Sequence, residues 1–152
     1  MMDTSTPKRA PIQSFRDLTV YQRAQSLMRD VHALVIGFPD HEKYGLTDQM
    51  RRASKSVGGL IAEGWGLRSS AKEFKNYLRR ALGSANEMEA HLDTARVLEY
   101  IAADLAERLI REYRELGGQL VRLAENWKTY DRPSSIVHPL PSAPNRREGP
   151  KR

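Results

Sequence analysis

Residues 70–98 read SAKEFKNYLRRALGSANEMEAHLDTARVL, and this stretch decides the fold. Its apolar residues recur three or four positions apart, which is the spacing of one face of an α-helix. Ser70 followed by Glu73 is the pattern of a capping box, in which each side chain accepts a hydrogen bond from a free backbone N–H. The stretch predicts a long amphipathic helix that continues to about Leu98, with an inner stripe formed by Phe74, Tyr77, Leu78, Ala81, Leu82, Ala85, Met88, Leu92 and Ala95.

Two flanking stretches show the same spacing. The first runs from about Thr19 to Ile36, and Pro39 stops it because proline cannot continue a helix. The last runs from about Ala103 to Trp127. Its Gly117-Gly118 pair predicts close packing or a kink, since each glycine costs a helix roughly 1 kcal/mol relative to alanine.

A fourth helix is predicted after Gly45, with Thr47 as its N-cap. Gly64 and Gly66 end it. No stretch alternates as a half-buried strand would, and short connections favour antiparallel neighbours. The sequence therefore predicts an all-α fold, an antiparallel up-down-up-down four-helix bundle.

The chain of 152 residues is long enough for one domain with one core. We expect a disordered N-terminal arm over residues 1–14, the bundle over residues 15–130, and a disordered, basic, Pro- and Ser-rich tail over residues 131–152. There is no cysteine, and no apolar run is long enough for a signal peptide or a membrane span. These features predict a cytoplasmic protein without membrane contact.

The formal net charge of +6 is unevenly distributed. Residues 51–80 alone carry +6, whereas the rest of residues 15–130 carries −4. A one-sided field of this kind attracts phosphate or an acidic protein surface. The candidate nucleic-acid-binding residues are Arg51, Arg52, Lys55, Arg68, Lys72, Lys75, Arg79 and Arg80.

The spacing of these cations suggests a shared surface. Lys72, Lys75 and Arg79 fall three or four positions apart, so they share one helix face that could track a phosphate backbone. We expect Arg51, Arg52 and Lys55 to lean in from the preceding helix. The alternative interpretation is an ordinary solvated helix surface, which is what most charge runs are.

Several motifs in order resemble one known family. They are FRDLTVYQRA at residues 15–24, KYGLTDQMRRA at 43–53, IAEGWG at 61–66 and ALGSANEME at 81–89. Together they resemble the bacterial four-helix-bundle family that includes proteins encoded in 23S rRNA intervening sequences and is related to the accessory variability determinant of diversity-generating retroelements. The resemblance spans about Phe15 to Trp127.

The resemblance implies a homopentameric barrel with a basic surface. It also implies a role in binding nucleic acid or a nucleic-acid enzyme, because the retroelement relatives partner a reverse transcriptase. This chain departs from the family at Gly58, where a proline is common, and at Leu60, where an asparagine is common. Any polar role of that asparagine is therefore absent here.

The sequence offers little for catalysis, metals or cofactors. A di-metal bundle needs Glu-x-x-His pairs, and the nearest feature is Glu87 with His91 one turn later, which we interpret as a surface hydrogen-bonded pair. We expect Glu63 to be partly buried beside an arginine, in a structural role. Trp65, between two glycines, is expected to be exposed and to contact a neighbouring subunit, with capping of the bundle end as the alternative.

Three hypotheses follow from the sequence. The first is a non-catalytic oligomeric adaptor that binds RNA or DNA phosphates by counterion release, with a reverse transcriptase as a candidate partner. The second is a protein scaffold whose basic face docks an acidic surface of a partner enzyme. The third, a bundle enzyme, needs an inward-facing polar cluster that the sequence does not reveal. Tyr21, Leu67, Ile101 and Ile110 lie off the inner stripes and are candidate subunit contacts.

Overall fold

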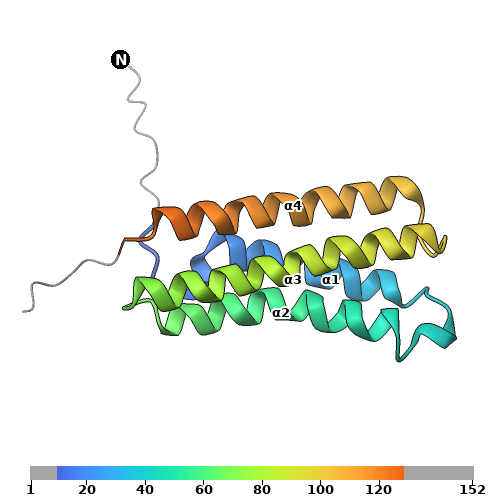
Figure 1. Ribbon diagram of the computed structural model, residues 1–152, viewed down its shortest axis with the longest axis horizontal. Helices are drawn as coiled ribbons and strands as arrows, with labels where there is room; N and C mark the ends of the chain where they lie inside the picture. Colours follow the sequence, from blue (N-terminus) through green and yellow to red (C-terminus); the bar gives the residue numbers. More distant parts are fainter. Residues whose placement is uncertain (1–9, 129–152) are drawn as a thin grey trace, which may run out of the picture.

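Four long helices pack side by side as a bundle in the computed structural model, which describes residues 10–128 (Figure 1). They are α1 (Thr19–Val35), α2 (Leu46–Gly66), α3 (Ala71–Val97) and α4 (Ala103–Asn126). Two short 3-10 turns, η1 (Phe15–Asp17) and η2 (Asp40–Glu42), precede α1 and α2. The predicted all-α class and the four helices are confirmed, and the described residues contain no strand.

The core is built from the apolar stripe of each helix. On α3, seven of the nine residues predicted for the stripe are buried, whereas Tyr77 and Leu82 lie half-buried at its edges. Large side chains fill the centre, and Phe74, Met50, Ile61 and Tyr113 are at most 1% exposed. Among the described residues, the buried polar side chains are those of Thr47 and Ser54. None of the described helices has an apolar stretch long enough to cross a membrane.

Helix α3 begins and ends with well-defined caps. The Ser70 hydroxyl accepts a hydrogen bond from the Glu73 backbone N–H at 3.3 Å, which is one half of the predicted capping box. At the other end, the Tyr100 N–H donates to the Ala95 carbonyl at 2.8 Å and the Glu99 N–H donates to the Arg96 carbonyl at 3.0 Å. This is a Schellman motif, and Glu99 takes its left-handed position with φ of 61°.

The start of α2 differs from the prediction. Thr47 is not the N-cap, because it lies inside the helix and is buried. The capping acceptor is instead the Glu42 carboxylate, which accepts a hydrogen bond from the Leu46 N–H at 2.8 Å. The Tyr100 hydroxyl donates to the same carboxylate at 3.1 Å, so the start of α2 is tied to the α3–α4 turn.

A short turn that the sequence did not predict, η1, precedes α1 and begins at Phe15. Ser14 caps η1 in a complete capping box with Asp17, whose carboxylate also accepts from the Gln13 N–H at 3.0 Å. The side chains of Ser14 and Asp17 stabilise η1, and the apolar periodicity of the sequence gives no indication of this turn. The predictions for residues 1–9 of the arm and for the tail at residues 131–152 lie outside the described residues.

Glycines let the helices approach closely and set their register. A Cβ on Gly64 would lie 2.6 Å from the Tyr77 Cβ of α3, and one on Gly117 would lie 3.0 Å from Leu82. The close packing predicted at Gly117 is therefore confirmed. Ser56 and Ser84 share a hydrogen bond of 3.0 Å, which fixes the level at which α2 and α3 face each other.

Candidate nucleic-acid interface

The first half of α3 presents a row of cations. Lys72 and Arg79 are exposed and Lys75 is half-buried beside them. Because α3 is a continuous helix here, their spacing of three and four places all three on one face, as the sequence predicted. None of the three forms an ion pair with a carboxylate in the described part of the chain. Their positive charges are thus available to an external anion.

A shallow hollow of about 490 Å³ lies beside this row. Its walls are Glu73, Asn76, Tyr77, Arg79 and Arg80, all from α3. The Arg80 guanidinium lies 5.0 Å from the centre of the Tyr77 ring, at cation–π distance. The arrangement combines two guanidinium groups with an amide donor, which are groups that bind phosphate oxygens.

The α2–α3 turn supplies a further cation held on an aromatic cluster. The Arg68 guanidinium stacks 4.4 Å from the Trp65 ring centre and donates to the Trp65 carbonyl at 3.0 Å. Trp65 in turn packs edge-on against Phe74 and Trp127, with ring centres 6.3 and 6.0 Å away. Arg68 is thereby fixed at the end of the bundle.

Trp65 is not the exposed turn residue that the sequence predicted. It belongs to α2, it is half-buried, and it caps the end of the core with Phe74 and Trp127, which is the alternative that the sequence left open. The flanking glycines do not expose it, because Gly64 is buried against α3. Glu63 also differs from its prediction: it is exposed, and no hydrogen bond or ion pair of its side chain occurs within residues 10–128.

Two of the three α2 cations, Arg51 and Arg52, do not join the α3 row. Arg51 lies two turns before Gly58, which packs against Tyr21 and Gln25, so Arg51 lies on the α1 side of α2. Arg52 is exposed, and its Nε is 3.0 Å from a carboxylate oxygen of Asp48 on the same helix, so its charge is already paired.

Distance along the bundle also separates Arg52 from the start of the α3 row. The Ser56–Ser84 hydrogen bond marks one level of the bundle. Arg52 lies four residues from this level along α2, away from the α2–α3 turn, and Lys72 lies twelve residues from it along α3, toward that turn. At 1.5 Å per residue the two are about 24 Å apart along the axis. The structure therefore brings together Arg68, Lys72, Lys75, Arg79 and Arg80, and places Arg51 and Arg52 apart from the start of that row. By the same count the exposed Lys55 is about 8 Å from Arg80 along the axis, so this distance does not separate Lys55 from the row.

A second arginine cluster, between α1 and α4, was not predicted. It surrounds a hollow of about 390 Å³ lined by Arg23, Arg111, Arg114, Glu115, Gly118, Gln119 and Arg122. Two of its arginines are already neutralised, because Arg23 pairs with Glu115 and Arg114 lies 3.2 Å from Glu89. Within α4, Arg114 and Arg122 follow Arg111 by three and eleven positions, so the sequence places these three arginines on one helix face. The sequence does not show that α1 adds Arg23 to them.

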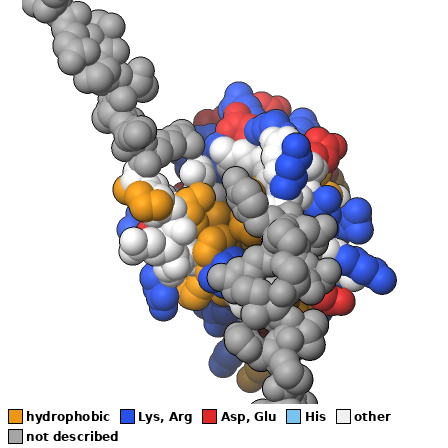
Figure 2. Space-filling model, turned by 90° about the vertical axis from the view of Figure 1, so that its left-hand side faces the viewer, with side chains coloured by type: hydrophobic (Ala, Val, Ile, Leu, Met, Phe, Trp, Pro, Cys, Tyr) orange, Lys and Arg blue, Asp and Glu red, His pale blue; other side chains and the backbone are white. Residues whose placement is uncertain are grey.

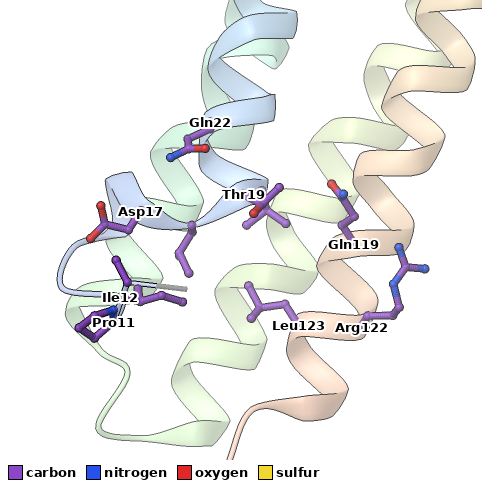
Figure 3. Close-up of a pocket in the computed structure, with 11 residues that line it drawn as sticks. Pro11, Ile12, Asp17, Thr19, Gln22, Gln119, Arg122 and Leu123 are labelled. Atoms are coloured by element: carbon purple, nitrogen blue, oxygen red, sulfur yellow. The ribbon is translucent and has the colours of Figure 1, made fainter. Parts of the chain in front are cut away.

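A groove of about 710 Å³, lined by both apolar and polar side chains, opens next to this cluster. The N-terminal segment and the start of α1 form one side, and the last turns of α4 form the other (Figure 3). Ile12 and Leu123 line it together with Gln119 and Arg122. The groove lies at the same end of the bundle as the α2–α3 turn.

The histidines and carboxylates are the remaining candidate metal ligands. Glu87 and His91 form the surface pair that the sequence predicted, with 3.1 Å between carboxylate oxygen and Nε2. Within residues 10–128, no group of three or more His, Asp or Glu side chains is arranged to hold a metal ion.

Comparisons with known proteins identify the family. A family profile described as 23S rRNA-intervening sequence protein matches residues 16–122. A solved structure from Bacteroides thetaiotaomicron, described as a protein with unknown function from the S23 ribosomal protein family, is 24% identical, with a TM-score of 0.64. The similarity covers 70% of this chain and 95% of that one, and it supports the helical fold. No significant match was found among curated proteins. Since the profile covers more than half of the sequence, the chain belongs to the family of 23S rRNA-intervening sequence proteins.

Proposed function

We propose that this protein is a non-catalytic, oligomeric adaptor that binds the phosphate backbone of nucleic acid. The observation that carries the proposal is the α3 row: Lys72, Lys75 and Arg79 lie on one face of one rigid helix, without a carboxylate partner in the described residues. Phosphate contacts of this kind release counterions, so binding depends on salt more than on base sequence.

The proposal includes features that the family resemblance implies. Each subunit is an up-down-up-down bundle, five subunits form a barrel, and the adaptor acts in the cytoplasm with a reverse transcriptase as its protein partner. An oligomer multiplies the modest charge of each subunit, and several rows acting on one nucleic acid raise the effective affinity. The family is named for an intervening sequence of 23S rRNA, which makes RNA the first ligand to test.

The exposed apolar residues narrow the candidate subunit contacts. Of the four residues predicted for this role, Leu67 is 42% exposed, whereas Tyr21, Ile101 and Ile110 pack against the core. Ile36, Tyr44 and Val97 are more exposed than any of these, at 77%, 86% and 72%. These three residues become the better candidates for burial between subunits.

The test is the salt dependence of binding to short RNA and DNA by the full chain. We expect the logarithm of the binding constant to fall linearly with the logarithm of the salt concentration. The triple variant K72Q/K75Q/R79Q should reduce the magnitude of that slope by about 0.7–0.9 for each phosphate that the protein no longer neutralises. The matched control R29Q/K43Q/R108Q removes three exposed charges from the other half of the bundle and should leave the slope nearly unchanged.

Two outcomes would change the interpretation. Absence of binding at low salt would refute the nucleic-acid adaptor and leave the protein scaffold that docks an acidic surface. Equal weakening of binding in both triple variants would show that net charge, and not the α3 row, governs binding. Light scattering on the same samples gives the number of subunits.

A further inference from the structure

Cations lie on both sides of the seam between α3 and α4. On α3, Lys75, Leu82 and Glu89 are seven positions apart, so they share one side of the helix. Contacts with α4 identify this side: a Cβ on Gly117 would lie 3.0 Å from Leu82, and the Arg114 Nε is 3.2 Å from a Glu89 carboxylate oxygen. Lys75, and with it the α3 row, therefore borders α4.

The arginines of α4 continue the positive charge on the other side of the seam. Arg114, Gly118 and Arg122 are four positions apart and lie on one face of α4, and Arg111 lines the same hollow. The ion pairs within residues 10–128 involve neither Arg111 nor Arg122. Two guanidinium groups are thus available to an external anion, next to Arg114, which is paired with Glu89.

Gly118 leaves room for one of these guanidinium groups. A glycine inside a helix is unfavourable relative to alanine, so its presence calls for a reason. At Gly117 the reason is packing against Leu82, but no side chain of another helix lies within 4 Å of a Cβ placed on Gly118. That Cβ would instead meet Nη1 and Nη2 of Arg122, at 3.4 and 3.9 Å. The Arg122 guanidinium therefore folds back along α4 and lies over Gly118.

The contacts across the seam also give the level of each group along the bundle. Leu82 precedes Glu89 whereas Gly117 follows Arg114, so toward the α2–α3 turn the residue numbers fall on α3 and rise on α4. Gly118 is then level with residue 81, two residues from Arg79, which is about 3 Å along the axis. Packed helices lie about 8–10 Å apart. The guanidinium groups of Arg79 and Arg122 thus face the same stretch of a bound polyanion.

We infer that the α3 row and the arginines of α4 form one basic track, and that a nucleic-acid backbone crosses the bundle obliquely along it, from α3 to α4. This inference rests on the proposed function and adds Arg111, Arg114 and Arg122 to the residues that bind phosphate. Figure 2 looks along the bundle onto the end with the α2–α3 turn, where Lys and Arg side chains project from the flanks around apolar side chains at the centre. The described cations at this end thus point to the sides of the bundle.

Carboxylates also border the track. Glu89 and Glu115 are each paired with an arginine, Arg114 and Arg23 respectively. Glu125, seven positions after Gly118, is exposed and forms no ion pair within residues 10–128. The track comprises Lys72, Lys75, Arg79, Arg111, Arg114 and Arg122, and with Arg23 its seven cations exceed these three carboxylates.

Charge removal tests the α4 part of the track. The variant R111Q/R122Q should weaken binding to a short RNA and reduce the magnitude of the salt slope by about 0.7–0.9 for each phosphate left without a cation. The control R29Q/K43Q also removes two exposed charges and should change the slope little. Arg29 follows Gln25 by one turn, and Gln25 contacts Gly58, so this charge lies on the α2 side of α1. An R111Q/R122Q variant that behaves like the control would overturn the track.

Photo-crosslinking tests the direction of the path, because the chain has no cysteine of its own. A photoreactive label on N86C reports a path toward α4, since Asn86 is exposed and follows Arg79 by two turns on the same face. A label on G59C reports a path over α2, where Gly59 is exposed and its Cβ would meet no atom within 4 Å. We expect RNA to crosslink mainly to N86C. An equal or higher yield from G59C would overturn the path to α4 and show that the backbone runs over α2 toward Lys55.

The two proposals fail in different ways. If the unmodified chain binds neither RNA nor DNA, the proposed function fails, and the track fails with it. If the chain binds with steep salt dependence and K72Q/K75Q/R79Q weakens binding, but R111Q/R122Q does not, only the extension onto α4 is wrong.

Discussion

At the scale of single residues, glycines mark where this bundle permits no side chain. Gly64 and Gly59 both lie within α2, five positions apart, but their surroundings are opposite. A Cβ on Gly64 would lie 2.6 Å from the Tyr77 Cβ and 3.2 Å from the Phe74 ring, whereas one on Gly59 would meet no atom within 4 Å. Gly64 thus holds α2 against the part of α3 that carries the basic row.

This contrast predicts opposite effects of one substitution. G59A should stabilise the protein by about 1 kcal/mol, because alanine has the higher helix propensity. G64A should destabilise it by about 1–3 kcal/mol, because the new methyl group overpacks the contact with Tyr77. Urea unfolding of both variants measures the difference. Equal stabilisation by the two substitutions would mean that α2 and α3 do not approach as closely as the structure shows.

At the scale of elements, helix bodies and helix ends differed in how well the sequence predicted them. The observed bounds of α1, α3 and α4 follow the predictions closely, because apolar periodicity and local stop signals are properties of neighbouring residues. The cap of α2 was wrong because its acceptor, Glu42, is held in place by Tyr100, 58 residues away in the sequence. No local pattern contains such a contact.

The Glu42 cap predicts a dependence of stability on pH. The hydrogen bond from the Leu46 N–H, with help from the Tyr100 hydroxyl, lowers the pKa of Glu42 below its ordinary value of 4.5. The unfolded chain then binds this proton more readily than the folded one, so the stabilisation is complete above pH 4.5 and is lost as the pH falls through the lower, folded-state pKa.

The variant E42Q should therefore be less stable at neutral pH. Its melting temperature should also fall less steeply than that of the unmodified chain as the pH is lowered. Thermal unfolding at a series of pH values measures both effects. The control E63Q removes an exposed carboxylate of α2 and should leave stability at neutral pH unchanged. If the melting temperature of E42Q fell with decreasing pH as steeply as that of the unmodified chain, Glu42 would not contribute to acid unfolding.

The candidate site was predictable to the extent that it lies on one helix. Spacing alone placed Lys72, Lys75 and Arg79 on a common face, and the structure agrees. Whether Arg51 and Arg52 join them depends on the register between α2 and α3. That register is set by the Gly64 contact and the Ser56–Ser84 hydrogen bond, neither of which leaves a signal in the charge pattern.

At the scale of the whole molecule, the position of the α3 row beside the α2–α3 turn restricts how subunits can assemble usefully. In a closed ring built by rotation about one axis, all bundles that run along that axis point the same way. All α2–α3 turns then share one rim, and the α3 rows beside them act together on one polyanion. A pairing through a two-fold axis across the bundles would instead point neighbouring α2–α3 turns in opposite directions and separate their α3 rows.

Energy transfer between subunits distinguishes these assemblies, and the proposed pentamer predicts the ring. A dye on S69C marks the α2–α3 turn, and a dye on A102C marks the opposite end of the bundle, just before α4. When donor-labelled and acceptor-labelled S69C subunits are mixed, we expect strong transfer, and the same should hold for A102C mixed with itself. Transfer between S69C donors and A102C acceptors should be weaker than in either of these mixtures, because the two labelled ends are about 40 Å apart along α3. Light scattering should give five times the monomer mass. Strongest transfer in the S69C–A102C mixture would reveal antiparallel subunits, and a monomeric mass would show that any RNA binding relies on the α3 row of a single subunit.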